Sequence, residues 1–360
     1  MGVGVCSSRK EPSQPAHELA RVNWGEMLAR LEPETVARAA AFWNADAGSL
    51  EFVSQSANAV YKFSSDGEVR FLRLVHHELR DHAFLAAGLD FLNHAWLAGA
   101  FVCQPVLSSR GCFIEDILQA DDVFLATVTA GVAGKTLGEI SESKRLEAGF
   151  EFGVNDTQML LESAQVQAWG QALATLHAAS ESYKPVPVRL SSGMVQFPES
   201  FSLLKFWANI KATCSEINSG DPDLQRVHAE LEAWLEMLPA SEMIVTHGDF
   251  RSGNAIWDGT RVTILDFDEP MLAWAEYDLA RTLLQDECDP FPNLEQHLAH
   301  FLEGYERARA LPNVKSRVKN FVRVRALLML AWSLEDSTWV NGAGIMLRKI
   351  AMHGLDWNSP

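Results

Sequence analysis

One short segment constrains this chain more than any other feature of its sequence. Residues 247–254 read HGDFRSGN, and a strand-like run at 262–268 reads VTILDFD. Asp258 and Gly259 lie between them, and Asp-Gly is a strong hairpin signal, so the second run is expected to fold back beside the loop. The pattern therefore predicts that three oxygen-bearing side chains converge on one spot: Asp249, Asn254 and Asp266.

Such a convergence suits phosphoryl transfer. A carboxylate orients a hydroxyl group and accepts its proton. An amide and a second carboxylate hold Mg²⁺, which prefers oxygen ligands and bridges nucleotide phosphates. The alternative is a surface hairpin whose Asp and Asn side chains only cap turns, as such residues often do. That alternative does not explain why the loop and the far end of the hairpin both carry ligand-type groups.

Composition and charge narrow the possible partners. The 360 residues suffice for two lobes at about 100–200 residues per domain. With 48% hydrophobic and 21% charged residues, the chain is neither disordered nor collagenous nor disulfide-stapled. The net charge of -17 repels a phosphate backbone, so no nucleic-acid partner is expected. No apolar run approaches the roughly 20 residues that span a bilayer, so no membrane partner is expected either.

The cysteines and the start of the chain bear on location. The five cysteines are odd in number and show no metal-binding spacing, which favours a reducing compartment. The first residues lack the long apolar region of a secretory signal. The sequence therefore predicts a cytoplasmic protein.

The first third of the chain alternates strand patterns with turns. Asp66 and Gly67 form a predicted hairpin turn. A helix is expected where Leu85, Leu89, Leu92 and Trp96 recur at helical spacing. The predicted strands are at residues 51–53, 59–63, 69–75, 102–107, 112–117 and 123–129. After Gly134 the pattern becomes mainly helical, so the predicted fold class is α+β.

Residues 131–136, GVAGKT, resemble the end of a phosphate-binding loop of the form GxxxxGK[ST]. The first glycine of that pattern would have to stand at position 129, which is Thr129. No long helix is predicted to open at Lys135, as the motif requires. We therefore do not interpret this segment as a phosphate site.

The loop pattern HGDxxxxN and the later LDF segment resemble the aminoglycoside phosphotransferase and choline kinase family of protein-kinase-like small-molecule kinases. The bacterial homoserine-kinase-like or stress-response-kinase-like branch is the most similar. The resemblance runs from about residue 50 to 340 and includes YDLA at 277–280. It implies a bilobal fold, with a small antiparallel-sheet N-lobe carrying one helix and a larger, mainly helical C-lobe. The expected boundaries are 1–30 for an N-terminal tail and lead-in helix, 31–130 for the N-lobe and 131–360 for the C-lobe.

The resemblance also implies ATP and Mg²⁺ as cofactors. It makes Asp249 the catalytic base and Asn254 and Asp266 the metal ligands. Six residues are expected to contact the nucleotide. Ser56 and Asn58 belong to a phosphate loop, Arg73 is a strand arginine in place of the usual lysine, and the hinge consists of Thr129, Ala130 and Gly131. Residues expected to support the loop are His247, Asp268 and Asp278. The implied acceptor is a hydroxyl of an amino alcohol, amino sugar, aminoglycoside or related metabolite.

One departure from the family pattern leaves alternatives open. The helix glutamate that would pair with the strand cation falls at Gly88, which cannot pair. A pseudokinase or nucleotide-binding interaction protein without turnover is therefore one alternative. A protein Ser/Thr kinase is a third, disfavoured because only eleven residues separate Asp266 from Asp278, too few for a separate activation segment.

Overall fold

The structure, a computed structural model, describes residues 5–6, 24–147, 159–185, 188–190, 193–195, 201–213, 220–284, 293–335 and 341–355. Most of the N-terminal tail expected from the sequence lies outside these residues. The chain divides into two units. The sheet unit comprises Met1–Leu97, Cys103–Val132 and Lys184–Phe197, and the helical unit comprises Ala98–Val102, Ala133–Tyr183 and Pro198–Pro360.

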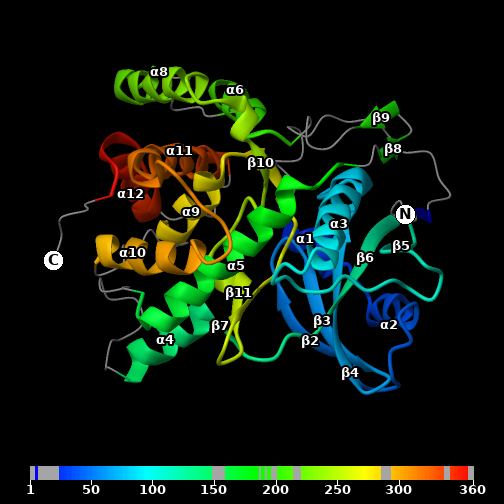
Figure 1. Ribbon diagram of the computed structural model, residues 1–360. Helices are drawn as coiled ribbons and strands as arrows, with labels where there is room; N and C mark the ends of the chain where they lie inside the picture. Colours follow the sequence, from blue (N-terminus) through cyan, green and yellow to red (C-terminus); the bar gives the residue numbers. More distant parts are fainter. Residues whose placement is uncertain are drawn as a thin grey trace. The chain divides into compact units, whose positions relative to one another are not determined.

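The sheet unit is built on a six-stranded sheet, drawn from blue to cyan in Figure 1. In spatial order its strands are β1 (Val5–Cys6), β5 (Ile114–Gln119), β6 (Asp122–Ala130), β4 (Glu68–His76), β3 (Ala59–Ser65) and β2 (Glu51–Gln55). All neighbours pair antiparallel except β1 with β5. Asp66 and Gly67, with φ of 54° and 78°, close β3 onto β4 in the left-handed region that such a turn requires. The predicted hairpin is confirmed.

Three helices complete the described core of the sheet unit: α1 (Trp24–Ala29), α2 (Pro33–Ala41) and α3 (His82–Leu97). The predicted leucine-bearing helix is confirmed as α3, in which Gly88 is buried. Trp43, just after α2, is fully buried in a cluster with Leu72 and Phe124 of the sheet. Its indole Nε1 donates to the carbonyl oxygen of Val106 at 2.8 Å, so a large side chain is buried without an unpaired N–H.

The strand predicted at 102–107 is wrong, whereas its two successors are confirmed as β5 and β6. This stretch makes only isolated bridges, from Val102 to Ile264 and from Pro105 to Thr129. Pro105 has no N–H to donate to a ladder, which is the physical reason why the pairing does not extend. Val102 and Ile264 both belong to the helical unit, so the run is divided between the two units.

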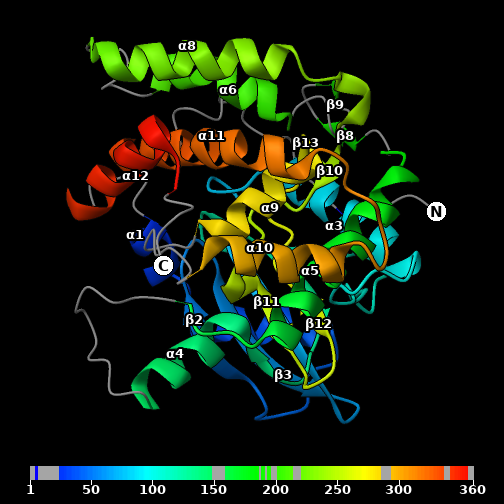
Figure 2. The same cartoon turned by 60° about the vertical axis from the view of Figure 1, so that its left-hand side comes forward.

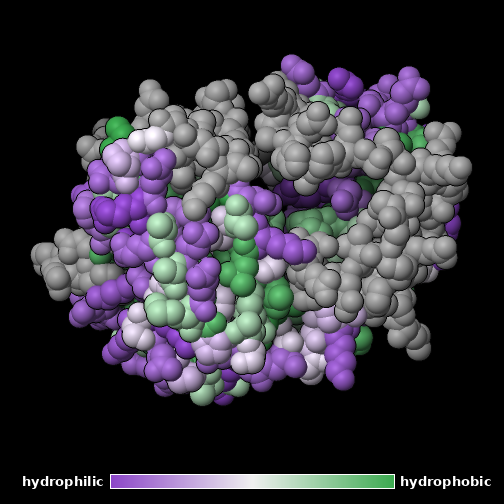
Figure 3. All heavy atoms as spheres, turned by 90° about the horizontal axis from the view of Figure 1, so that it is seen from above, coloured by the Kyte–Doolittle hydropathy of each residue, from purple (hydrophilic) through white to green (hydrophobic). Residues whose placement is uncertain are grey.

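Two features bear on the predicted location. Cys112 is disulfide-bonded, so cysteine usage does not by itself support a reducing compartment. Within the described part of the chain, none of the helices combines the length and the apolar character needed to cross a membrane. On the face shown in Figure 3, hydrophobic residues are interspersed with hydrophilic ones.

The helical unit is mainly α-helical, as predicted. Its described helices include α4 (Leu137–Glu147), α5 (Ser163–Glu181), α6 (Leu203–Thr213), α8 (Pro222–Glu236), α9 (Ala275–Leu283), α10 (Leu294–Tyr305), α11 (Val314–Glu335) and α12 (Asn341–His353). Lys135 and Thr136 form the short strand β7, and helix α4 begins only at Leu137 and has 11 residues, so no long helix opens at Lys135. Gly134 packs against the backbone of Trp257. A Cβ added at Gly134 would lie 2.2 Å from the Trp257 carbonyl oxygen, so a larger residue does not fit there.

Helices α5 and α10 lie side by side in both views of the ribbon (Figure 2). Two glycines let their backbones approach closely. A Cβ on Gly170 of α5 would lie 2.0 Å from the carbonyl oxygen of Phe301, and one on Gly304 of α10 would lie 1.8 Å from that of Gln167. These contacts are with backbone, which cannot rotate away as a side chain can.

Gly304→Ala is expected to destabilise the protein by at least about 2 kcal/mol, since overpacking costs about 1–3 kcal/mol and here the obstacle is backbone. Gly344→Ala in α12 is the matched control, because nothing lies within 4 Å of its added Cβ. That control should gain up to about 1 kcal/mol from helix propensity. Thermal and urea unfolding of the two variants measure the difference. Equal stabilities would contradict the close approach of α5 and α10.

Candidate active site

The HGD loop follows a short strand of the helical unit. Strand β10 (Ile244–Thr246) pairs antiparallel with β13 (Met271–Ala273), and residues 247–254 leave its end. Gly248 has φ of 84°, and a Cβ there would lie 1.7 Å from the carbonyl oxygen of Glu269. Only glycine fits this position, because both the dihedral angle and the close backbone exclude a side chain. The second letter of the motif therefore sets the path of the loop toward Asp249.

A hairpin returns the chain to this loop. Strand β11 (Ala255–Trp257) pairs antiparallel with β12 (Val262–Ile264), and Asp258 Oδ1 closes the turn by accepting from the N–H groups of Thr260 and Arg261. Beyond β12, the N–H of Leu265 donates to the carbonyl oxygen of Asn254 at 2.9 Å. The next residue, Asp266, is thus held beside the end of the loop.

Asp249 and Asn254 are in direct contact. The Nδ2 of Asn254 donates to the carbonyl oxygen of Asp249 at 2.9 Å and lies 3.3 Å from Oδ2 of its carboxylate. Both contacts use the amide nitrogen of Asn254, so its Oδ1 is the end that faces away from Asp249. A side-chain carbonyl oxygen is a ligand type that Mg²⁺ takes.

Asp278, in the first turn of α9, holds the loop in place by hydrogen bonds to its backbone. Its fully buried carboxylate accepts from the N–H of His247 at 2.6 Å and from the N–H of Gly248 at 2.8 Å. His247 in turn places Nε2 2.7 Å from the carbonyl oxygen of Leu265, and its Nδ1 accepts from the N–H of Asp249. These contacts fit the tautomer with the proton on Nε2. His247 therefore ties the loop to the segment that carries Asp266.

The support extends away from the loop through a buried chain of polar groups. His177 of α5 places Nε2 3.1 Å from the Asp278 carboxylate and Nδ1 2.8 Å from the hydroxyl of Tyr305. Burial lowers the pKa of His177 although Asp278 opposes this, and burial raises the pKa of Tyr305. A neutral His177 then donates to Asp278 and accepts from Tyr305. His177 is thus a fully buried core histidine that belongs to a hydrogen-bonded network.

Three arginines surround the Asp249 carboxylate. Oδ1 lies 2.7 Å from Nε of Arg281 and 3.1 Å from Nη2 of Arg325, and Oδ2 lies 3.1 Å from Nε of Arg251. Burial alone would raise the pKa of Asp249, but the three guanidinium groups together hold it well below its usual range. The carboxylate is therefore ionised, as a group that receives a hydroxyl proton must be.

Sequence reasoning missed these arginines. Arg251 lies within the HGD motif itself, and Arg281 follows the family-like YDLA segment directly. Arg325 precedes a seven-residue apolar run, and a charged residue inside a buried helix stretch signals a buried partner. That signal was available, but the partner 76 residues earlier in the chain could be recognised only from the fold.

The donor set fits a divalent cation held jointly with phosphate. Asn254 and Asp266 supply oxygen atoms, and Mg²⁺ is commonly bound by one or two such side chains together with substrate phosphates. Among the described residues, no cluster of three or more His, Cys, Asp and Glu side chains forms a purely protein metal site. Asp268 lies two residues beyond Asp266 and is partly exposed.

The nucleotide residues expected from the sequence belong to the sheet unit. Ser56 and Asn58 form the turn between β2 and β3, where the N–H of Ser56 donates to the carbonyl oxygen of Asn58 at 2.9 Å. Arg73 is half-buried on β4. Thr129 and Ala130 end β6, and Gly131 follows; the N–H groups of Ala130 and Gly131 donate to the carbonyl oxygens of Gln104 and Val69. Contact of these residues with a nucleotide remains a prediction.

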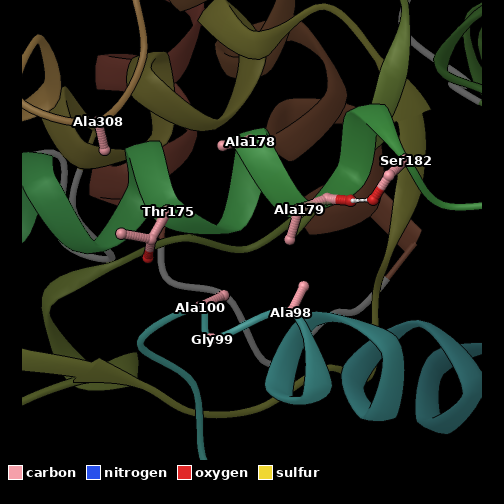
Figure 4. Close-up of a pocket in the computed structure, with 8 residues that line it drawn as sticks. All are labelled: Ala98, Gly99, Ala100, Thr175, Ala178, Ala179, Ser182 and Ala308. Atoms are coloured by element: carbon pink, nitrogen blue, oxygen red, sulfur yellow. Dashed lines mark hydrogen bonds between the residues drawn. The ribbon is translucent and has the colours of Figure 1, made fainter.

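A pocket of about 360 Å³ in the helical unit carries no comparable chemistry (Figure 4). Five alanines and a glycine line it, together with Thr175 and Ser182. The Ser182 hydroxyl donates to the carbonyl oxygen of Ala179. None of the lining residues is titratable, so we assign it no part in the reaction.

Comparison with known proteins identifies the family of the chain. The profile of the phosphotransferase enzyme family matches residues 49–311, well over half of the chain. The chain therefore belongs to the phosphotransferase enzyme family. The family predicted from the sequence is confirmed, and the chain is accordingly a phosphotransferase.

Individual relatives are distant but cover most of the chain. Amicoumacin kinase of Bacillus subtilis (strain 168) is 22% identical over 311 residues, 83% of either chain. The solved structure of amicoumacin kinase hAmiN in complex with AMP-PNP, Ca²⁺ and Ami has a TM-score of 0.68 at 20% identity, covering 91% of this chain and 94% of that one. A microcompartment-associated aminopropanol kinase has a TM-score of 0.64 at 19% identity, covering 89% and 95%. These likenesses confirm the predicted α+β, protein-kinase-like fold.

Proposed function

We propose that the chain transfers the γ-phosphoryl group of ATP to a hydroxyl group of a small amine-bearing molecule. The arrangement of Asp249, Asn254 and Asp266 around one loop carries the proposal. Asp249 orients the acceptor hydroxyl and receives its proton. Asn254 and Asp266 hold Mg²⁺, which when bound neutralises charge on the phosphates. Asp278 and His247 fix the loop, and Asp268 supports the segment that carries Asp266.

The sheet unit is proposed to bind the nucleotide. Ser56 and Asn58 would lie over the phosphates, and Arg73 would grip them, since a guanidinium contacts phosphate through two parallel N–H groups. Thr129, Ala130 and Gly131 would form the adenine hinge. The N–H groups of Ala130 and Gly131 are already bonded within the sheet unit, so we expect adenine to meet carbonyl oxygens there. Domain boundaries at about residues 30 and 130 and a cytoplasmic location belong to the same proposal.

An acceptor panel scored by ADP release tests the function. The panel includes aminopropanol and amicoumacin, for which similar kinases are named, and spectinomycin and hygromycin B, which are bound in solved structures of similar fold. Homoserine and choline extend the panel to simpler alcohols. At least one acceptor should raise Mg²⁺-dependent ADP release about tenfold or more above the rate with water. If none does and Mg-ATP fails to bind, the pseudokinase interpretation raised by Gly88 replaces this one.

Arg73→Ala should weaken ATP binding by about tenfold or more, since a charge-assisted hydrogen bond is worth about 1.5–3 kcal/mol. Arg70→Ala is the matched control. Arg70 lies on the same strand but three residues away, hence on the opposite face, where it contacts the carbonyl oxygen of Trp43. Calorimetric titration with AMP-PNP measures both. Unchanged affinity in Arg73→Ala would show that another cation grips the phosphates.

A further inference from the structure

Two buried arginines from distant helices hold one oxygen atom of Asp249. Arg281 of α9 is 3% exposed and Arg325 of α11 is 2% exposed. Both donate to Oδ1, at 2.7 and 3.1 Å. An oxygen atom of a carboxylate has about two lone-pair sites, so these donors occupy Oδ1 fully.

Neither arginine is free to follow a ligand, because each is fixed by further contacts. Arg281 also donates through Nη1 to the carbonyl oxygen of Leu284. Arg325 donates through Nη1 to the carbonyl oxygen of Gly248 at 2.6 Å and to the hydroxyl of Tyr277 at 2.7 Å. Its guanidinium carbon also lies 5.3 Å from the centre of the Tyr277 ring. Arg325 therefore joins the backbone of the loop, its carboxylate and α9 in one rigid group.

The other oxygen, Oδ2, has different partners. It contacts Nδ2 of Asn254 at 3.3 Å and Nε of Arg251 at 3.1 Å. The side chain of Arg251 is 33% exposed, against 4% for Arg281 and 3% for Arg325. The guanidinium of Arg251 lies over Gly253, where an added Cβ would approach Nη1 to 2.9 Å. Arg251 is thus the most exposed of the three arginines on this carboxylate.

We propose that Arg281 and Arg325 are positioning residues that clamp Oδ1 of Asp249 and so reserve Oδ2 for the acceptor hydroxyl. This inference rests on the proposed function. The hydroxyl proton passes to Oδ2 as the acceptor oxygen bonds to the γ-phosphorus. The bond from that phosphorus to the β–γ bridging oxygen breaks, and ADP leaves with the electron pair. Arg251 yields its place on Oδ2 when the hydroxyl binds.

The test separates positioning from general stability. Arg281→Gln and Arg325→Gln should each lower kcat about tenfold or more with the panel's best acceptor, or with water if none is found. The dissociation constant for Mg-AMP-PNP should stay within about threefold. Arg323→Gln is the matched control. Arg323 lies on α11 two residues before Arg325 and forms an ion pair with Glu230, and its loss should leave kcat unchanged.

A double-variant cycle completes the experiment. If the arginines act through Asp249, adding either glutamine variant to Asp249→Asn should cost less than about twofold in the residual single-turnover rate. A merely structural role would repeat the full loss in that background and overturn the proposal. Should the glutamine variants fail to fold, Arg281→Lys and Arg325→Lys keep the charge but lose the two-pronged geometry, and should still lower kcat about fivefold or more. Unchanged kcat in the lysine variants overturns the proposal, whereas an inactive wild-type protein overturns the proposed function instead.

Discussion

Asp249→Asn is expected to lower phosphoryl transfer by about 10²–10⁴-fold, the usual contribution of a positioned base. The asparagine keeps the shape of the side chain but cannot receive the hydroxyl proton. ATP affinity should change by no more than about threefold, because the base acts on the acceptor and not on the nucleotide. Steady-state kinetics and AMP-PNP titration measure the two effects separately.

The same substitution leaves three guanidinium groups without their shared carboxylate. We therefore expect a loss of stability as well, below the 3–5 kcal/mol typical of fully buried pairs because Asp249 is 24% exposed. Asp258→Asn is the matched control, since Asp258 caps the exposed turn of the same hairpin and the amide preserves that cap. Full activity in Asp249→Asn would remove Asp249 from the reaction.

Asp266→Ala is expected to abolish the Mg²⁺ dependence of ATP binding. Removing a carboxylate ligand leaves Asn254 and the phosphates to hold the cation. Titration of ATP with and without Mg²⁺ should give well-separated curves for the wild-type protein and coincident curves for the variant. Equal Mg²⁺ effects in both proteins would contradict the assignment of Asp266 as a ligand.

The backbone at Asp266 calls for two companion variants. Its φ of 66° lies in the left-handed region, which Asp and Asn tolerate better than alanine does. Asp266→Gly should therefore lose the Mg²⁺ effect without the backbone strain of the alanine. Asp266→Asn should keep the conformation and one oxygen ligand, and retain a weaker Mg²⁺ effect. This order separates the loss of a ligand from the loss of a backbone conformation.

Local sequence signals predicted those parts of the fold that depend on local chemistry. The turn at Asp66 and Gly67, the β3–β4 hairpin and α3 follow from residue periodicity and left-handed turn preferences. The strand predicted at 102–107 is wrong because the periodicity there suggests a strand, whereas Pro105 interrupts the ladder of hydrogen bonds and the run is shared between two units. Pattern alone does not report such a division.

Some residues of the candidate site could likewise be predicted from local sequence, and others could not. The HGD motif places Asp249 and Asn254 just before the β11–β12 hairpin, and the Asp258 turn brings the chain back so that Asp266 follows just after it. A short segment of sequence was therefore enough to expect the three residues near one another. Arg281 and Arg325 reach the same carboxylate from helices 32 and 76 residues farther along the chain. Their convergence depends on the packing of α9 against α11, which is tertiary structure and leaves no trace in local spacing.

Phosphorus NMR of a reaction with Mg-ATP and the best acceptor of the panel tests the central claim most directly. Transfer to a hydroxyl predicts a new phosphomonoester resonance that grows as the γ-phosphate signal of ATP declines and ADP appears. With the Asp249→Asn protein, no phosphomonoester resonance should appear and the γ-phosphate signal of ATP should stay constant on the same timescale. Appearance of ADP with inorganic phosphate alone, at the same rate with and without acceptor, would contradict the account.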